Sequence, residues 1–249
     1  MMIAVLVGCA GGTKAPTLEN KPVVDPVKPV ASSAARGLVF EVVDNDSAYM
    51  RLVFAHVGMA AGGGATDPAA VAAGITVEVD AWIVEDTNAR QQDHYLLAAD
   101  RDGATGRARI ERYIAELAST DATFAIRPDH ELGFERIDAT HWRSYYLFKT
   151  VELDGSAVAH AEVALDPNTG RPLVLLDFDS ASSKKLGDLT ARIVGKKLAT
   201  ILDGTIRSAP IINGAIRGGR ASIAMGGTDP AAQEKEAHAL VEVLSHAKP

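Results

Sequence analysis

The chain has 249 residues, of which 47% are hydrophobic and 23% charged, and its formal net charge is −7. This composition excludes a fibrous or wholly disordered protein, and the length accommodates one or two domains. The acidic balance argues against nucleic acid as the main partner, because phosphate binding needs a basic surface. Since no apolar run approaches the ~20 residues that cross a bilayer, we expect neither a channel nor a transporter.

The N-terminal segment carries the single cysteine, Cys9, which excludes a disulfide within the chain. A short apolar run, Leu6-Val7-Gly8, precedes this cysteine and small residues follow it. The arrangement resembles a bacterial lipoprotein signal, and the resemblance implies cleavage before Cys9 and lipidation of its thiol. The alternative is an ordinary tail with a chance cysteine, because the apolar run is short and no Lys or Arg precedes it.

Residues 13–36 contain prolines dispersed among Lys, Glu, Asp and Ser, and their valines follow neither a helical nor a strand period. Such a stretch buries too little apolar area to fold, and its prolines favour extended backbone. We therefore interpret residues 1–36 as a lipoprotein-like signal followed by a disordered, Pro-rich tether. Folding is expected to begin near Gly37.

The first half of the folded body predicts alternating strands and helices. A strand at 38–43 leads into a helix whose apolar face holds Met50, Val53, Phe54 and Val57. Residues 59–74 predict a surface loop, since the glycines at 62–64 lack the Lys and Ser/Thr of a phosphate loop. Further elements are expected as an alternating strand at 75–84 with odd-numbered residues 77–83 on its apolar face, a polar break at 85–93, a strand at 95–98, a helix at 107–119, and strands at 123–127, 133–137 and 143–149.

The second half is richer in turn signals. Asp166 to Gly170 predicts a hairpin turn between strands at 158–165 and 172–178. A helix at 180–194 ends before Gly195, and Asp203-Gly204 is a two-residue hairpin turn after a strand at 197–202. Pro210 marks an edge or a bulge. A strand at 221–225 and a helix opening at Asp229-Pro230 complete an α+β pattern.

One motif in this half resembles a known family. The stretch Gly195 to Ile212 reads GKKLATILDGTIRSAPII and resembles the first periplasmic domain of SecD, an accessory subunit of the bacterial Sec protein translocase. Asp166 to Gly170 upstream and Ile216 to Gly219 downstream extend the resemblance. It is good from about residue 150 to 248 and looser from 37 to 149.

The resemblance implies two small antiparallel sheet and helix subdomains after the disordered tether: a base and an inserted, ferredoxin-like head. Residues 37–149 would form the base-like subdomain, and residues 150–249 the head-like subdomain with its C-terminal helix. In that family the head is thought to contact exported polypeptide, and proton coupling resides in following transmembrane helices. Only the extracytoplasmic part of that function would carry over to a chain that lacks those helices.

We therefore expect a non-catalytic module that assists protein export at the periplasmic face of the envelope. Its expected partners are unfolded exported polypeptide, Sec translocase components, and a membrane through the lipid anchor, with the outer membrane favoured because Ala10 follows Cys9. No cofactor, small-molecule substrate or nucleic acid is expected. Two alternatives stay open: an envelope scaffold lipoprotein that binds one folded partner, and a truncated or split SecD fragment without an independent role.

Candidate site residues follow from the same motif. An open sheet edge accepts an extended polypeptide by backbone pairing, which favours the edge at Arg207, Ser208, Ala209 and Pro210 as the contact. Gly195, Asp203, Gly204 and Pro210 are interpreted as keepers of the fold.

The sequence offers little sign of catalysis or metal binding. No nucleophile motif is present. Asp129-His130-Glu131 holds metal-ligand types, but neighbours on an extended chain point to opposite faces. Asp177 and Asp179 share one strand face, where solvated carboxylates are the more usual interpretation. We therefore predict neither an enzyme nor a metal site.

Overall fold

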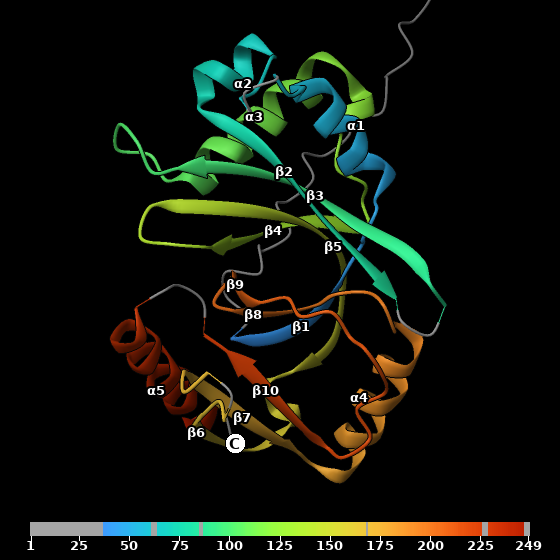
Figure 1. The fold of residues 1–249 in the computed structure, drawn as a ribbon, viewed down its shortest axis with the longest axis vertical. Coiled ribbons are helices and arrows are strands. Elements are labelled where there is room, and N and C mark those ends of the chain that lie inside the picture. Colours follow the sequence, from blue (N-terminus) through green and yellow to red (C-terminus); the bar gives the residue numbers. More distant parts are fainter. Residues whose placement is uncertain (1–36, 61–63, 85–86, 168, 226–228, 247–249) are drawn as a thin grey trace, which may run out of the picture. The chain divides into compact units, whose positions relative to one another are not determined.

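A computed structural model describes residues 37–60, 64–84, 87–167, 169–225 and 229–246 (Figure 1). This part of the chain is a mixed α+β protein with a seven-stranded and a three-stranded sheet. Among its helices, none combines the length and the apolar character needed to cross a membrane. The predictions about Cys9 and the tether lie outside the described residues.

The larger sheet closes on itself. Its strand order is β1 (Leu38–Val43), β8 (Leu198–Leu202), β9 (Thr205–Ser208), β4 (His130–Arg136), β5 (His141–Asp154), β3 (Ala89–Ala99) and β2 (Ile75–Val84). β1 also pairs with the far half of β5. The five strands β1, β8, β9, β4 and β5 therefore form a closed ring, and β3 and β2 extend the sheet beyond β5. Val39, Tyr145, Leu147 and Ile201 belong to one buried cluster of these strands.

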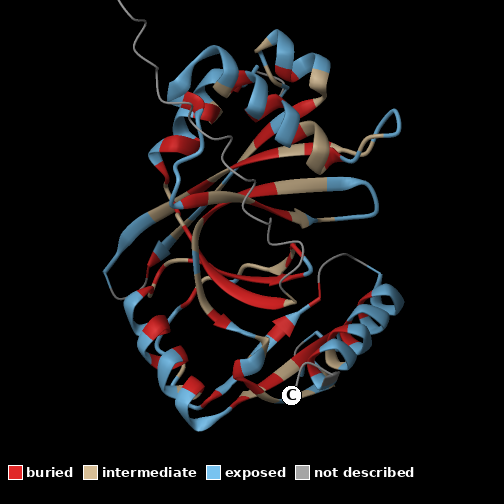
Figure 2. Ribbon diagram, turned by 180° about the vertical axis from the view of Figure 1, so that it is seen from behind, coloured by how far each residue is buried: buried red, intermediate tan, exposed pale blue. Residues whose placement is uncertain are grey.

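The smaller sheet has the order β10 (Arg220–Ala224), β7 (Pro172–Phe178) and β6 (Val158–Leu165), all antiparallel. Helices α4 (Ser180–Arg192) and α5 (Pro230–His246) contact this sheet. Phe40 of β1, Leu176 of β7, Leu186 of α4 and Leu240 of α5 lie in one buried cluster. Figure 2 shows that the strands are largely buried, whereas the outer sides of the helices are exposed.

Three helices, α1 (Ala48–Val57), α2 (Pro68–Ala73) and α3 (Gly106–Thr120), pack with β2, β3 and β5 around a second cluster. Each begins at a side chain that caps the first turn: Ser47, Asp67 and Thr105 accept hydrogen bonds from backbone N–H groups three residues on. In the predicted 107–119 helix, the apolar side chains Ile110, Tyr113, Ile114 and Leu117 share one face and are all buried.

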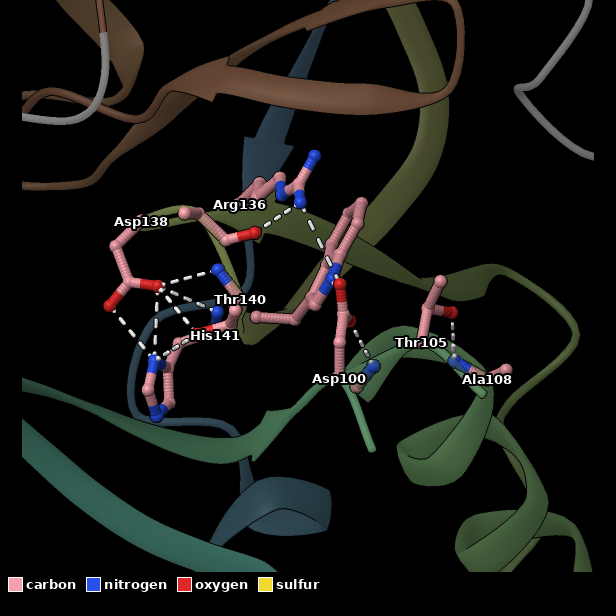
Figure 3. A network of polar contacts seen from close by, with 10 residues as sticks. Asp100, Thr105, Ala108, Arg136, Asp138, Thr140 and His141 are labelled. Carbon is pink, nitrogen blue, oxygen red and sulfur yellow. Dashed lines mark hydrogen bonds and ion pairs between the residues drawn. The ribbon is translucent and has the colours of Figure 1, made fainter. Parts of the chain in front are cut away.

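The polar contacts in Figure 3 connect the start of α3 with the β4–β5 hairpin. Asp100 Oδ1 accepts hydrogen bonds from Gly106 N at 2.7 Å and Trp142 Nε1 at 2.8 Å, and Oδ2 lies 3.6 Å from Arg136. In the hairpin turn, Asp138 Oδ1 accepts from the backbone N–H groups of Thr140 and His141, both at 2.8 Å. These two N–H donors lower the pKa of Asp138 to about 2.

Several predicted elements are confirmed. The hairpin strands 158–165 and 172–178 have the predicted bounds, and the strands at 38–43 and 75–84 also match. The Asp203-Gly204 turn joins β8 to β9 with φ of +48° and +72°, both in the left-handed region. The predicted division between residues 149 and 150 falls inside β5, and it stays a prediction.

Three predictions in the first half are wrong. Residues 59–74 contain α2, whose N-cap Asp67 and first-turn Pro68 outweigh the Ala and Gly content. Residues 123–127 form no strand. The 3₁₀ turn η2 (Ala122–Phe124) covers the first of them. The polar break is largely strand, because β3 begins at Ala89.

The alternation of β2 also reverses part-way. Val79 and Ile83 are 40% and 54% exposed, although they were expected on the apolar face. The opposite face turns inward because its polar groups find partners: Asp80 accepts a hydrogen bond from Tyr95 at 2.9 Å, and Trp82 Nε1 donates to the Gly195 carbonyl at 2.9 Å.

Candidate functional site

An apolar groove of about 420 Å³ is lined by β1, β8, β10, α4 and the segment after β9. Its apolar walls come from elements far apart in sequence, and include Phe40, Phe178, Leu186, Leu198 and Ile223. The rings of Phe40 and Phe178 lie 6.0 Å apart at an angle of 57°, a favourable tilted contact. The groove therefore offers an apolar surface with ordered aromatic side chains.

One wall of the groove is a strand edge. Within the described ranges β10 pairs only with β7, in the antiparallel register Ser222↔Leu175, and it ends the three-stranded sheet. Ala221, Ser222 and Ile223 line the groove, and Ser222 is exposed while Ile223 is buried. Figure 1 shows β10 running between α4 and α5. The edge of a terminal strand presents backbone donors and acceptors to a further strand.

Another part of the lining is residues 210–214, which are held in place by backbone hydrogen bonds. The Pro210 carbonyl accepts from Leu198 N at 3.1 Å, and Ile212 N donates to the Lys196 carbonyl at 2.9 Å. Further on, Ile216 N donates to the buried Thr190 hydroxyl of α4 at 2.8 Å. The wall is thus tied at both ends, and Asn213 and Gly214 between these ties are exposed.

Arg220, one of the lining residues, forms an ion pair with Asp177 of β7. Arg220 Nε and Nη2 lie 2.6 and 3.1 Å from the two carboxylate oxygens of Asp177. The hydrogen bond from Arg220 holds the pKa of Asp177 below its usual value. Because Arg220 is already neutralised, the groove as a whole favours an apolar ligand over a charged one.

The four consecutive residues predicted as a contact edge, Arg207 to Pro210, have different surroundings in the structure. Strand β9, with Arg207 and Ser208, stands between β8 and β4 in the sheet, and its register with β4 is the one pair Ile206↔Glu135. Arg207 Nη1 lies 3.7 Å from Glu236 of α5, away from the groove. Of the four, Pro210 lines the groove, and the free edge beside it belongs to β10. Contact between this segment and polypeptide stays a prediction.

The predicted fold-keeping residues have definite local roles. Gly195 has φ of +84°, and a Cβ there would lie 2.5 Å from Val84 Cγ2. The carbonyl of Gly204 accepts a hydrogen bond from Arg107 at 3.0 Å. The Pro210 carbonyl continues the pairing of β8 beyond β9, as described above.

The acidic and histidine motifs are engaged in the fold. Asp177 pairs with Arg220, whereas Asp179 caps α4 by accepting from Ser182 N at 2.8 Å. His130 is 1% exposed, and its two ring nitrogens lie 3.3 Å from Asp44 and 2.8 Å from Asp129. Among the described residues, no group of three or more His, Cys, Asp or Glu is placed to hold a metal ion.

Sequence reasoning missed the groove. Phe40, Leu198 and Ile223 occupy strands whose apolar residues have the same pattern as any core strand. Only the pairing of β1 with β8 and the terminal place of β10 in its sheet make them one surface. The one signal in the sequence was Pro210, which marked an irregular end of pairing close to the groove.

The chain was compared with known protein families and sequences, and part of it matches. Residues 133–245 match the family described as the SecDF P1 head subdomain, and this range holds every groove residue named above except Phe40. Over 88 residues the chain is 41% identical to the protein translocase subunit SecD of Rickettsia prowazekii, covering 34% of this chain and 17% of that protein. This is a SecD periplasmic domain-like chain.

A second SecD relative also matches part of the chain. The SecD-like chain is 33% identical over 120 residues to the protein translocase subunit SecD of Magnetococcus marinus, covering 47% of this chain and 22% of that protein. It thus spans about a fifth of the length of the curated relatives it matches. Two solved structures are also similar. A membrane component SecDF that enhances protein export is 19% identical with a TM-score of 0.34, and the match covers 83% of this chain and 92% of that chain. SecDF of Thermus thermophilus is 22% identical with a TM-score of 0.33, and the match covers 85% of this chain and 29% of that chain.

Proposed function

We propose that this chain assists protein export by holding a segment of unfolded, translocating polypeptide in the groove beside β10. The observation that carries the proposal is a terminal strand edge lying along an apolar groove. An extended chain would add to the β10 edge through its backbone, while alternate side chains enter the groove. Backbone pairing is independent of sequence, so one groove would serve many clients.

The chemistry of the groove fits an unfolded client. An exported polypeptide has unpaired backbone groups and exposed apolar side chains, which a folded surface protein hides. The walls at Phe40, Phe178 and Leu198 would cover such side chains. Because Arg220 is already paired with Asp177, it would not select for a charged side chain in the client. In this function the chain is a binding module and performs no bond-breaking chemistry.

The proposal includes a setting outside the cytoplasm, at the periplasmic face of the envelope. Its supports are the SecD relatives, which are named protein translocase subunits, and the lipoprotein-like sequence around Cys9. Lipidation at Cys9 and a Pro-rich tether would hold the folded body close to a membrane, the outer membrane by the Ala10 criterion. Sec translocase components are the proposed partners there. Mass spectrometry of the mature N-terminus tests the anchor, and an unmodified chain beginning at Met1 contradicts it.

The groove itself can be tested by filling it. Gly214 lines the groove, and a Cβ added there meets nothing within 4 Å, so Gly214→Trp places a large side chain in the groove without a backbone clash. Gly218 is equally open but lies outside the lining, which makes Gly218→Trp a matched control. We expect Gly214→Trp to weaken binding of an unfolded apolar peptide by about 10-fold or more, and Gly218→Trp to leave it within about 2-fold.

A photocrosslinker at the exposed Ser222 gives a second readout in cells. Labelling of many translocating chains from Ser222, well above labelling from the exposed Glu162 on β6, supports the proposal. Equal labelling from the two positions contradicts it. A single dominant folded partner would favour the envelope scaffold instead, and no labelled partner at all would favour a SecD fragment without an independent role.

A further inference from the structure

A second pocket, beside helices α2 and α3, is lined by arginines. It has a volume of about 220 Å³ and lies between the end of α2, the loop 101–104 and the outer face of α3. Arg101, Arg109 and Arg112 all line it. Three guanidinium groups around one small pocket stand out in a chain with a net charge of −7.

The guanidinium groups of Arg101 and Arg109 converge on one point. Arg109 is fixed because its Nε donates to the Ala73 carbonyl at the end of α2 at 2.8 Å, and its Nη2 contacts the same oxygen. A Cβ built on Gly74 would lie 2.8 Å from Arg109 Nη2 and 3.7 Å from Arg101 Nη1. Both nitrogens thus lie near the same point beside Gly74, and an anion placed between two like charges would reduce their repulsion.

Two carboxylates, Asp102 and Glu116, line the pocket beside the three arginines, so its lining keeps one positive charge in excess. Arg101 Nε lies 2.9 Å from Asp102 Oδ2, and the side chain of Asp102 is 80% exposed. Arg112 is exposed and forms no ion pair with any residue that the structure describes. Glu116, the other acid of the lining, likewise forms none in this part of the chain. The pocket keeps free N–H donors as well as positive charge.

We propose that this pocket binds a phosphate group. The guanidinium fork matches phosphate oxygens with paired, charge-assisted hydrogen bonds. The rest of the lining is small, with Ala72, Ala73 and Ala104, and the ring of Tyr113 is buried with its hydroxyl bonded to Asp67 at 3.1 Å. No exposed aromatic face of this lining is available to stack a nucleobase, so the phosphate group itself is what the pocket recognises. It comes either from a soluble phosphate or from a phospholipid headgroup.

The test measures binding of two probes to the full chain: inorganic phosphate by ³¹P NMR titration, and vesicles of phosphatidylcholine with or without phosphatidylglycerol by co-sedimentation. The variant R101Q/R112Q removes two exposed charges from the pocket, and R90Q/R171Q removes two exposed charges elsewhere. We expect R101Q/R112Q to weaken binding by about 10-fold and the control to change it by less than about 2-fold. E116Q, which removes a carboxylate from the lining, is expected to strengthen binding severalfold.

The two probes distinguish the sources. Arginine-dependent binding of inorganic phosphate alone assigns a soluble phosphate, and arginine-dependent binding of phosphatidylglycerol vesicles assigns a lipid headgroup. The proposal is overturned if the unmodified chain binds neither probe at millimolar phosphate or lipid. It is also overturned if R101Q/R112Q and R90Q/R171Q weaken binding equally, since net charge alone would then explain the effect. Circular dichroism melts verify folding, and R112Q alone replaces the double variant if the latter unfolds.

Discussion

The Lys197 ammonium lies 3.1 Å from Asp93 Oδ2, and the two side chains are only 7% and 6% exposed. Lys197 also lies 3.2 Å from Asp80, and 4.7 Å from the centre of the Trp82 ring. Burial alone would raise the pKa of Asp80, but the hydrogen bond from Tyr95 and the charge of Lys197 lower it below its usual value. This cluster connects the residue that precedes β8 to the β2–β3 hairpin through a charge buried inside the protein.

Replacing Lys197 by Met is therefore expected to destabilise the fold strongly. The substitution leaves Asp93 as a buried carboxylate without its cation, and the loss of one partner of a buried pair costs about 3–5 kcal/mol. Urea unfolding measures the change in the free energy of unfolding. Lys196→Met, at a neighbour whose side chain has no such partner, should change it by less than about 0.5 kcal/mol.

A second substitution separates charge from packing. Asp93→Asn in the Lys197→Met background removes the unpaired charge, so we expect it to recover a substantial part of the lost stability. If Lys197→Met costs less than about 1 kcal/mol, or if Asp93→Asn adds a further loss, the buried pair does not hold the hairpin to β8.

Gly195 is required for a different reason, which is space. Its φ of +84° disfavours any side chain, and a Cβ would lie 2.5 and 2.9 Å from the two methyl groups of Val84. We expect Gly195→Ala to destabilise the protein by about 2–4 kcal/mol. Adding Val84→Ala should restore the steric part but not the backbone part, giving a coupling of about 1 kcal/mol or more between the two sites. Additive effects of the two substitutions would argue against the contact.

Local chemistry explains which elements could be predicted. The hairpin from Val158 to Phe178 has a Pro and a Gly in its turn and apolar-rich runs on both sides of it, so its bounds follow from the sequence. The helix around Ile110 and Leu117 has a clear apolar stripe. The sequence-based prediction failed mainly for polar residues in strands. Asp80 and Asp93 have the sequence pattern of solvent-facing or loop residues, because their partner Lys197 is more than 100 positions away in the chain.

The candidate site could be predicted only in part. The family motif drew attention to Pro210, which does line the groove. The place of β9 between β8 and β4 could not be predicted, because the parallel pairing of Ile206 with Glu135 joins segments 71 residues apart and has no sequence signal. The groove depends on which strand ends each sheet, and that is a property of the whole topology.

The turn between β8 and β9 offers a direct test of backbone conformation. Asp203 and Gly204 have φ of +48° and +72°, the pattern of a two-residue turn that favours Asn or Asp followed by Gly. Gly204→Ala should cost about 1–2 kcal/mol, because a Cβ is disfavoured in this conformation. Asp203→Asn should change stability by less than about 0.5 kcal/mol, since Asn tolerates positive φ. A neutral Gly204→Ala, measured by thermal or urea unfolding, would contradict the turn.

The β4–β5 turn predicts a dependence of stability on acid (Figure 3). The N–H groups of Thr140 and His141 lower the pKa of Asp138 from 3.8 to about 2 in the folded state. A lowered pKa means that the unfolded chain binds this proton first, so the stabilising contribution is complete above about pH 4 and is lost as the pH falls through 2. Asn at this position keeps an oxygen acceptor but does not titrate. We therefore expect the free energy of unfolding of the unmodified chain to fall more steeply between pH 4 and 2 than that of Asp138→Asn. Urea titrations at several pH values measure both slopes, and identical slopes would show that Asp138 keeps an ordinary pKa in the folded protein.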